Sequence, residues 1–352
     1  MKKVLFIVAF VLIVALLLIA VVIQKTESAD ETEEEPAAQT SAEVPYTYAL
    51  REDGTVEIVK YTGKEERVVI PGKIDKRRVT RIADNAFAAN NIVRSVVLPK
   101  GVLEIGELAF AACFKLQSVA IPDGVLEIGE KAFAYCSSLD NVTVPGSVTD
   151  LGESAFAGCA FLQTVTLEKG VKTVGAFMFA DCQSLQYVTL PSGVSAIEEG
   201  AFRNCKSLRE IFLPDSVQKI GKKAFYCCEG LTQVELPERL EVMDTAAFAG
   251  CGRLSSVKFG NRLKTVSSFA FSFCTAMREI ALPGSVQTVE KMAFLGCASM
   301  RRAKLPGSVE KIGKWAFGMC PNLEEFIVER NSYALSWCGE NDYAHTFANS
   351  FI

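Results

Sequence analysis

The chain has 352 residues, of which 49% are hydrophobic, and a formal net charge of −4 at pH 7. Residues 1–45 contain three lysines and seven acidic residues, so residues 46–352 have no net charge. A domain without net positive charge or a basic stripe lacks the electrostatic footprint of a nucleic-acid binder. We therefore expect no nucleic-acid partner.

The chain begins with a long apolar segment. Val4 to Ile23 are consecutive apolar residues, enough for a helix of about 30 Å that crosses a bilayer. Residues 1–23 are therefore predicted to be a signal anchor. Lys2 and Lys3 precede the span and only Lys25 closely follows it, which favours a cytoplasmic N-terminus and an extracellular remainder. A cleaved signal peptide, which would release a secreted protein, is the alternative.

Residues 24–45 are rich in Glu, Ala, Ser and Thr and contain Pro36 and Pro45. They show no apolar periodicity, and their acidic side chains repel one another. This composition predicts a disordered linker between the membrane and the rest of the chain.

A repeat dominates the sequence after this linker. Phenylalanine recurs eleven times with a constant spacing of 23 residues, at 87, 110, 133, 156, 179, 202, 225, 248, 271, 294 and 317. Cysteine follows each phenylalanine by three positions, except in the first unit, where Asn90 takes its place. Leucine or methionine follows six positions after most of them, as at Leu116 and Met277. A fixed period of this length indicates a solenoid.

One unit shows how a coil would form. Val119 and Ile121 alternate around Ala120, which is the period-two pattern of a strand, and Pro122 ends that strand because it cannot donate to a ladder. Val125 and Ile128 lie on a second short extended stretch, and the segment around Phe133 closes the coil as a helix or turn. Such a unit cannot bury its apolar face alone, so neighbouring coils must stack.

The repeated pattern Leu-x-x-Val-x-Leu-Pro-x-x-Val-x-x-Ile-Gly-x-x-Ala-Phe-x-x-Cys resembles the BspA-like class of bacterial leucine-rich repeats. The resemblance implies a β-rich solenoid of about eleven 23-residue coils with a parallel sheet and short helical or turn segments, after the transmembrane helix. We expect a capping β unit at 46–82, repeats at 83–328 and a C-terminal cap at 329–352. Eight positions separate Pro71 from Val79, against three from Pro99 to Val102, so the first unit holds an insertion.

The ten cysteines of the repeat have no short C-x-x-C spacing, so no metal site is predicted. In neighbouring coils they would lie close enough for disulfides. Cysteine also behaves as a small buried apolar residue, and a column of free thiols is the favoured interpretation. Cys227 and Cys338 lie outside this column and are expected to be more reactive.

No catalytic or cofactor-binding residue is predicted, and we do not expect an enzyme. His345 is the only histidine, and no phosphate-binding glycine loop or nucleophile motif is present.

The outward sheet face is the predicted ligand surface. Tyr187, Arg209 and Phe212 should lie on neighbouring coils near its middle, and tyrosine and arginine are enriched at interface hot spots. The alternative is a plain sheet surface that carries two aromatic residues by chance.

The family resemblance implies surface proteins that bind host extracellular components, other cells or envelope partners. We therefore expect a membrane-anchored, extracellular, adhesin-like binding protein whose partner is a protein ligand. The alternative is a non-catalytic scaffold or spacer of the cell envelope. Neither ligand identity nor oligomeric state follows from the sequence.

Overall fold

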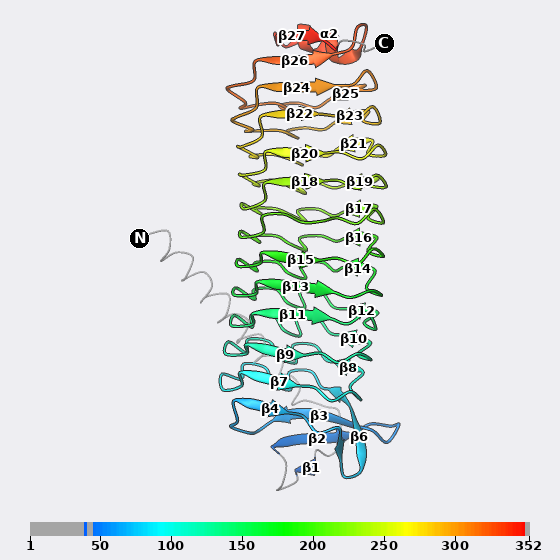
Figure 1. Cartoon of the computed structure of the whole chain (residues 1–352), viewed down its shortest axis with the longest axis vertical. Helices are drawn as coiled ribbons and strands as arrows, with labels where there is room; N and C mark the ends of the chain where they lie inside the picture. The colour runs from blue at the N-terminus through cyan, green and yellow to red at the C-terminus, as the bar shows by residue number, and fades with distance from the viewer. Residues whose placement is uncertain (1–38, 41–44, 349–352) are drawn as a thin grey trace, which may run out of the picture. The chain divides into compact units, whose positions relative to one another are not determined.

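The computed structural model describes residues 39–40 and 45–348, which form two compact units that divide after Leu162. Each unit is a stack of coils in which strands of equivalent position lie side by side (Figure 1). The predicted membrane span, Val4–Ile23, lies outside the described residues. Within the described part of the chain, no helix has the length and hydropathy needed to cross a membrane.

The first unit opens with a small sheet that covers the end of the stack. Strands β2 (Tyr46–Leu50) and β3 (Val56–Tyr61) form an antiparallel hairpin, and β3 pairs in parallel with β6 (Arg77–Ile82). Strand β1 (Gln39–Thr40) pairs antiparallel to β2. β1 lies inside the predicted linker, so these two residues form a strand where the composition predicted disorder; residues 24–38 and 41–44 lie outside the described residues.

The insertion in the first unit is a β-hairpin. Strand β5 (Lys73–Ile74) pairs antiparallel with the start of β6. Asp75 and Lys76 connect them with φ angles of 48° and 64°, the left-handed conformation at both central residues that two-residue hairpin turns require. The extra residues therefore extend a hairpin without disturbing the coils that follow.

Each coil of the first unit contributes two short strands. The first column contains β4 (Arg67–Val69), β7 (Ser95–Val97), β9 (Ser118–Ala120) and β11 (Asn141–Val144), and β4, β7 and β9 pair in parallel. The second column continues from β6 through β8 (Glu104–Ile105), β10 (Glu127–Ile128) and β12 (Asp150–Leu151), again in parallel.

The second unit repeats this plan. Its first column contains β13 (Thr164–Leu167), β15 (Tyr187–Thr189), β18 (Gln233–Glu235), β20 (Ser256–Lys258), β22 (Glu279–Ala281), β24 (Arg302–Leu305) and β26 (Glu325–Val328). Its second column contains β14 (Thr173–Val174), β16 (Ala196–Ile197), β17 (Lys219–Ile220), β19 (Val242–Met243), β21 (Thr265–Val266), β23 (Thr288–Val289) and β25 (Lys311–Ile312). In the paired strands, residues 23 apart in sequence face each other, as Val165 faces Val188.

The third side of each coil is a run of turns rather than a helix. Residues two positions before and two after the repeated phenylalanine adopt positive φ, as at Lys131 (54°) and Tyr135 (60°) around Phe133. A left-handed residue every few positions prevents a continuous right-handed helix. The sequence allowed either a helix or a turn for this segment, and the structure shows turns.

The repeated phenylalanines form the core of each unit. Their rings stack between successive coils at centroid distances of 4.7–5.2 Å from Phe87 to Phe156 and 4.9–5.7 Å from Phe179 to Phe317. Tyr61 stacks on Phe87 at the N-terminal end. The parallel register of the coils brings identical side chains together, so one apolar position per repeat produces a continuous column.

The C-terminal end of the second unit is closed by helix α2 (Tyr333–Glu340) and strand β27 (His345–Phe347). The Ser332 hydroxyl caps the helix by accepting a hydrogen bond from the Leu335 amide. Phe326 is fully buried against Trp337, with ring centroids 5.6 Å apart. These contacts shield the last coil from solvent.

Candidate functional site

Two of the predicted ligand residues lie together on the outward sheet face of the second unit. Tyr187 begins β15 and is 63% exposed, and Phe212 on the next coil is 79% exposed. Arg209 is also exposed, but it does not line the groove to which the two aromatic residues contribute.

A groove of about 580 Å³ runs across this face. Its apolar lining consists of inward-pointing residues of three coils, namely Val188, Ile211, Leu213, Val234 and Leu236. Its polar and aromatic lining consists of Gln186, Tyr187, Thr189, Glu210, Phe212, Asp215, Gln233, Glu235, Glu238 and Lys258, with Pro237 beside them. A concave surface that combines apolar residues with a few convergent polar groups is the usual form of a ligand site.

The strand ladder is interrupted where the groove lies. Ile211 and Leu213 alternate inward and are buried, so the sequence predicts a strand there, yet residues 208–214 form none. Among the described residues, the backbone amides and carbonyls of Glu210–Leu213 form no hydrogen bond. Every other coil of the second unit keeps its strand in this column. The coil therefore keeps its inward register while its backbone polar groups remain open to a ligand or to solvent.

The groove is acidic. Glu210, Asp215, Glu235 and Glu238 contribute four carboxylates, and Lys258 is the one cationic residue of the lining. The Lys258 ammonium lies 3.5 Å from the Glu235 carboxylate, with both side chains well exposed. Exposed ion pairs of this kind contribute little to stability. Because four carboxylates face one ammonium, the groove carries an excess of negative charge.

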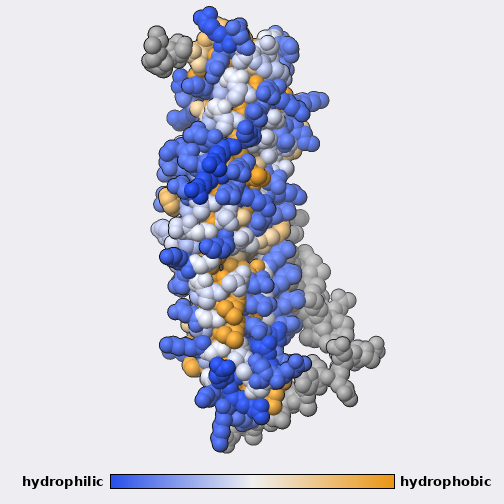
Figure 2. Space-filling model, turned by 90° about the vertical axis from the view of Figure 1, so that its right-hand side faces the viewer, coloured by the Kyte–Doolittle hydropathy of each residue, from blue (hydrophilic) through white to orange (hydrophobic). Residues whose placement is uncertain are grey.

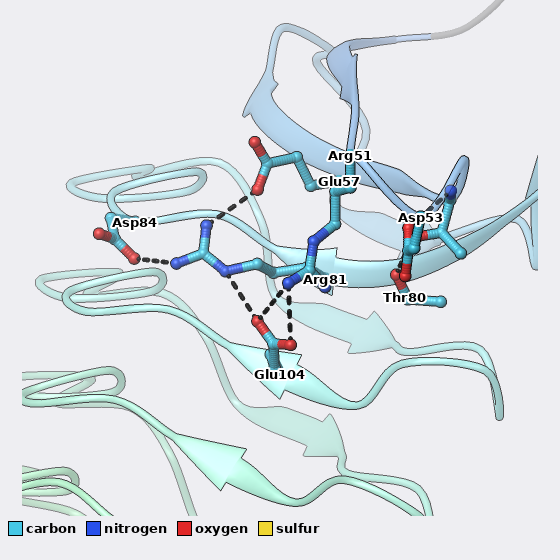
Figure 3. Close-up of polar contacts among 8 residues, drawn as sticks. Arg51, Asp53, Glu57, Thr80, Arg81, Asp84 and Glu104 are labelled. Carbon is cyan, nitrogen blue, oxygen red and sulfur yellow. Dashed lines mark hydrogen bonds and ion pairs between the residues drawn. The ribbon is translucent and has the colours of Figure 1, made fainter.

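A second cluster of charges lies in the first unit, shown in Figure 3. The Arg81 guanidinium contacts Glu57 (2.9 Å), Asp84 (2.8 Å) and Glu104 (3.2 Å), and Arg51 also donates to Glu104 at 3.0 Å. Burial alone would lower the pKa of Arg81, but the hydrogen bond to Glu57 and the surrounding carboxylates raise it. Because the two guanidinium groups pair with the three carboxylates, the cluster ties the N-terminal cap to the first coils, and most of its charge is neutralised within it.

An apolar surface is also present on the first unit. Leu103 and Leu126 are exposed immediately before β8 and β10, and Figure 2 shows hydrophobic residues gathered among hydrophilic ones on the face that it draws. These leucines lie outside the groove and its polar groups, so they offer less basis for specific recognition.

The column cysteines are buried thiols with a structural role. The Sγ atoms of nine of these cysteines donate to the carbonyl of the phenylalanine in the preceding coil, for example Cys136 to Phe110 at 3.2 Å and Cys228 to Phe202 at 3.1 Å. Burial raises the pKa of Cys159 to about 12. Reactivity requires the thiolate, so these positions favour packing over chemistry. The structure thus agrees with free thiols.

The two cysteines outside the column do not have the environment of reactive thiols. Cys338 lies inside α2, fully buried, and burial raises its pKa to about 11. Cys227 is partly exposed, but burial also raises its pKa. Both thiols therefore keep pKa values above the ordinary one, because no nearby positive charge offsets burial. Cys227 is more accessible than the fully buried column thiols, so the greater reactivity of these two cysteines relative to the column stays a prediction.

The one histidine of the sequence lies in the described part of the chain, which also contains candidate metal ligands. His345 lies exposed on β27, with its Nδ1 3.2 Å from the Tyr343 carbonyl. Within residues 39–40 and 45–348, no group of three His, Cys, Asp or Glu side chains is arranged to hold a metal ion.

Sequence reasoning located two aromatic residues of the site and missed the groove between them. The signal that could have revealed its character is the concentration of acidic residues on two successive coils, with Glu210 and Asp215 on one and Glu235 and Glu238 on the next. The interruption of the ladder at 210–213 has no such signal, since this coil follows the same apolar pattern as its neighbours.

A family model for the BspA type leucine rich repeat region matches the chain in six copies, over residues 66–186, 173–276 and 218–340. These ranges cover most of both units. No curated protein matches the chain.

Several solved structures are similar to this chain. A leucine rich cell surface protein from Faecalibacterium prausnitzii is 29% identical, with 89% of this chain and 99% of that chain covered and a TM-score of 0.49. A leucine-rich repeat protein from Bacteroides ovatus is 25% identical, with 88% and 100% covered and a TM-score of 0.48. The pneumococcal vaccine antigen PcpA is 21% identical, with 84% and 82% covered and a TM-score of 0.59, a likeness of fold.

Proposed function

Because the chain belongs to the family of BspA type leucine-rich repeat proteins, we propose that it is a non-catalytic binding protein displayed outside the cell. Residues 4–23 anchor it in the membrane with the N-terminus in the cytoplasm, and the repeats face the exterior. Its role is adhesin-like: it recognises a protein ligand through the sheet face at Tyr187 and Phe212.

The observation that carries this proposal is the exposure of two large aromatic side chains beside a groove. Tyr187 and Phe212 are mostly exposed although each could bury a large apolar area, and both line the groove. Aromatic residues next to well-packed pockets commonly contribute most of the affinity at protein interfaces.

The test of binding uses cells that express the full chain on their surface. Adhesion is measured to immobilised extracellular-matrix proteins and to envelope proteins of the producing cell. Wild-type cells should adhere to at least one matrix protein, and Tyr187→Ala with Phe212→Ala should reduce adhesion at least tenfold, the scale expected for a hot spot. Phe161→Ala with Tyr333→Ala is the matched control, because it removes two other exposed aromatic residues.

Two outcomes would contradict this role. Adhesion that survives the Tyr187 and Phe212 substitutions would exclude this face as the binding surface. Retention of envelope proteins of the same cell, with no binding to any matrix protein, would favour the scaffold or spacer role in place of the adhesin-like one.

The anchor is tested separately. Protease added to intact cells should remove the repeats, and the intact mass of the protein from the membrane fraction should include residues 1–23. A protein that begins after residue 23 and appears in the medium would instead establish a cleaved signal peptide.

A further inference from the structure

We propose that the groove binds an extended segment of a partner protein that carries lysine or arginine side chains. This inference rests on the proposed function, because it assigns the chemistry of the ligand at the same sheet face. Three independent features of the groove support it: its charge, its aromatic residues and its open backbone.

Charge complementarity identifies basic side chains as the ligand groups. Glu210, Asp215, Glu235 and Glu238 line the groove against a single cation, Lys258. Glu210, Asp215 and Glu238 form no ion pair with a basic side chain among the described residues. Glu238 accepts hydrogen bonds from the backbone and side-chain amide groups of Asn261, which carry no charge. A face with unneutralised carboxylates attracts cationic partners and repels acidic ones.

The aromatic residues favour the same ligand. Phe212 projects from the coil that also carries Glu210, and Tyr187 lies on the neighbouring coil. An ammonium or guanidinium over an aromatic face is attracted by the ring quadrupole, and arginine stacks on such faces as well. A basic side chain in this groove would therefore contact a carboxylate and a ring at once.

The open backbone favours an extended ligand. The amides and carbonyls of Glu210–Leu213 form no hydrogen bond within the described residues, and backbone polar groups require partners when they are covered. An extended peptide supplies alternating amides and carbonyls that can satisfy them, while its side chains alternate between the groove and solvent. A compact ligand without backbone groups would leave these polar atoms desolvated.

The test measures fluorescence anisotropy with the full chain in detergent. The probes are labelled eight-residue peptides of alternating Arg and Val, or alternating Glu and Val, and a labelled dextran. The Arg–Val peptide should bind, and the Glu–Val peptide and the dextran should not. Glu210→Gln with Glu235→Gln should weaken binding roughly tenfold, and Lys258→Gln should strengthen it about threefold.

The control is Glu310→Gln with Glu340→Gln, which removes the same charge from exposed positions outside the groove. Equal loss in the control and groove variants would show that net charge alone attracts the peptide and would overturn the site. Binding of the dextran in preference to the Arg–Val peptide would overturn it in favour of a carbohydrate ligand.

The two proposals fail in different ways. One outcome is that cells adhere to a matrix protein through Tyr187 and Phe212 while the Arg–Val peptide does not bind and the charge variants leave adhesion unchanged. In that case the chemistry assigned to the ligand is wrong and the binding function stands. If the peptide binds in the groove but no extracellular protein is recognised, the groove chemistry stands and the adhesin-like function is wrong.

Discussion

At the scale of single residues, the closest approach between coils occurs at corner glycines. A Cβ atom added to Gly129 would lie 2.7 Å from the Glu107 amide nitrogen and 2.7 Å from the Gly106 carbonyl carbon. Both are backbone atoms of the preceding coil, so no side-chain rotation can relieve the contact. The φ angle of Gly129 is not in the left-handed region, so the backbone conformation does not require glycine there. The close contact with the preceding coil does.

Gly129→Ala should therefore lower the free energy of unfolding by roughly 1–3 kcal/mol, the usual cost of forcing an extra carbon into a packed site. Gly284→Ala is the control, since a Cβ there would meet no atom within 4 Å. Urea unfolding followed by circular dichroism measures both. Equal stability of the two variants would show that the coils separate at little cost.

At the scale of elements, the stacked phenylalanines are the main packing unit. Phe225 lies between Phe202 and Phe248, with ring centroids 5.4 and 4.9 Å away and interplanar angles of 12° and 6°. It is fully buried. Removing one ring leaves a cavity that the neighbouring coils cannot fill, because each ring is held by its own coil.

Phe225→Ala should lower the free energy of unfolding by about 3–5 kcal/mol, as measured by denaturant titration. Phe161→Ala, which removes an exposed ring, should change it by less than about 0.5 kcal/mol. A small loss for Phe225→Ala would mean that the stack relaxes around the missing ring.

The N-terminal cap depends on a different interaction. Arg81, which is mostly buried, links carboxylates of three segments through its three nitrogens. Arg81→Met should destabilise the cap by roughly 1–2 kcal/mol, because it leaves the Glu57 and Asp84 carboxylates without a cation, while Glu104 keeps Arg51. The loss should decrease in 1 M salt, where the repulsion between those carboxylates is screened.

Hydrogen exchange of the amides in β3 and β6 reports on this cap directly, since local opening exposes them before the whole unit unfolds. The control is Arg302→Met, whose partner Glu279 is exposed on the sheet face, and it should leave exchange unchanged. Faster exchange in both variants would indicate a general effect of charge removal.

The elements also show what the sequence can predict. The 23-residue period predicts which residues face inward, because only one register brings every Phe, Cys and Leu column together, and the alternation around Ala120 predicts the strand found at β9. The left-handed turns at residues such as Lys131 were not predicted, because their side chains do not require that conformation.

The candidate site was predicted only in part for a related reason. Outward residues such as Tyr187 and Phe212 follow from strand alternation. The groove depends on the missing ladder at Glu210–Leu213, and the spacing between neighbouring coils is set by packing of the whole stack. A local pattern such as Ile211-x-Leu213 specifies which side chains face inward, but it does not specify the distance to the next strand.

At the scale of the whole molecule, the column of buried thiols links stability to pH. Burial raises the pKa of Cys159 from its ordinary value of 9.0 to about 12, and the pKa values of Cys205, Cys228 and Cys274 are raised well above that ordinary value. In the unfolded chain these thiols lose their protons near pH 9, whereas in the folded chain they keep them. The neutral form is therefore favoured by folding, and its contribution is fully present below pH 9.

Stability should accordingly fall as pH rises from 9 towards 12, by roughly 1 kcal/mol per pH unit for each buried cysteine. Denaturant titrations at pH 8, 9, 10 and 11 measure this slope. Cys159→Ala should make it shallower by that amount, because alanine has no proton to lose, whereas Leu162→Val should shift the free energy of unfolding equally at every pH. An identical slope in wild type and Cys159→Ala would mean that this thiol ionises as readily in the folded chain as in the unfolded one, which its complete burial contradicts.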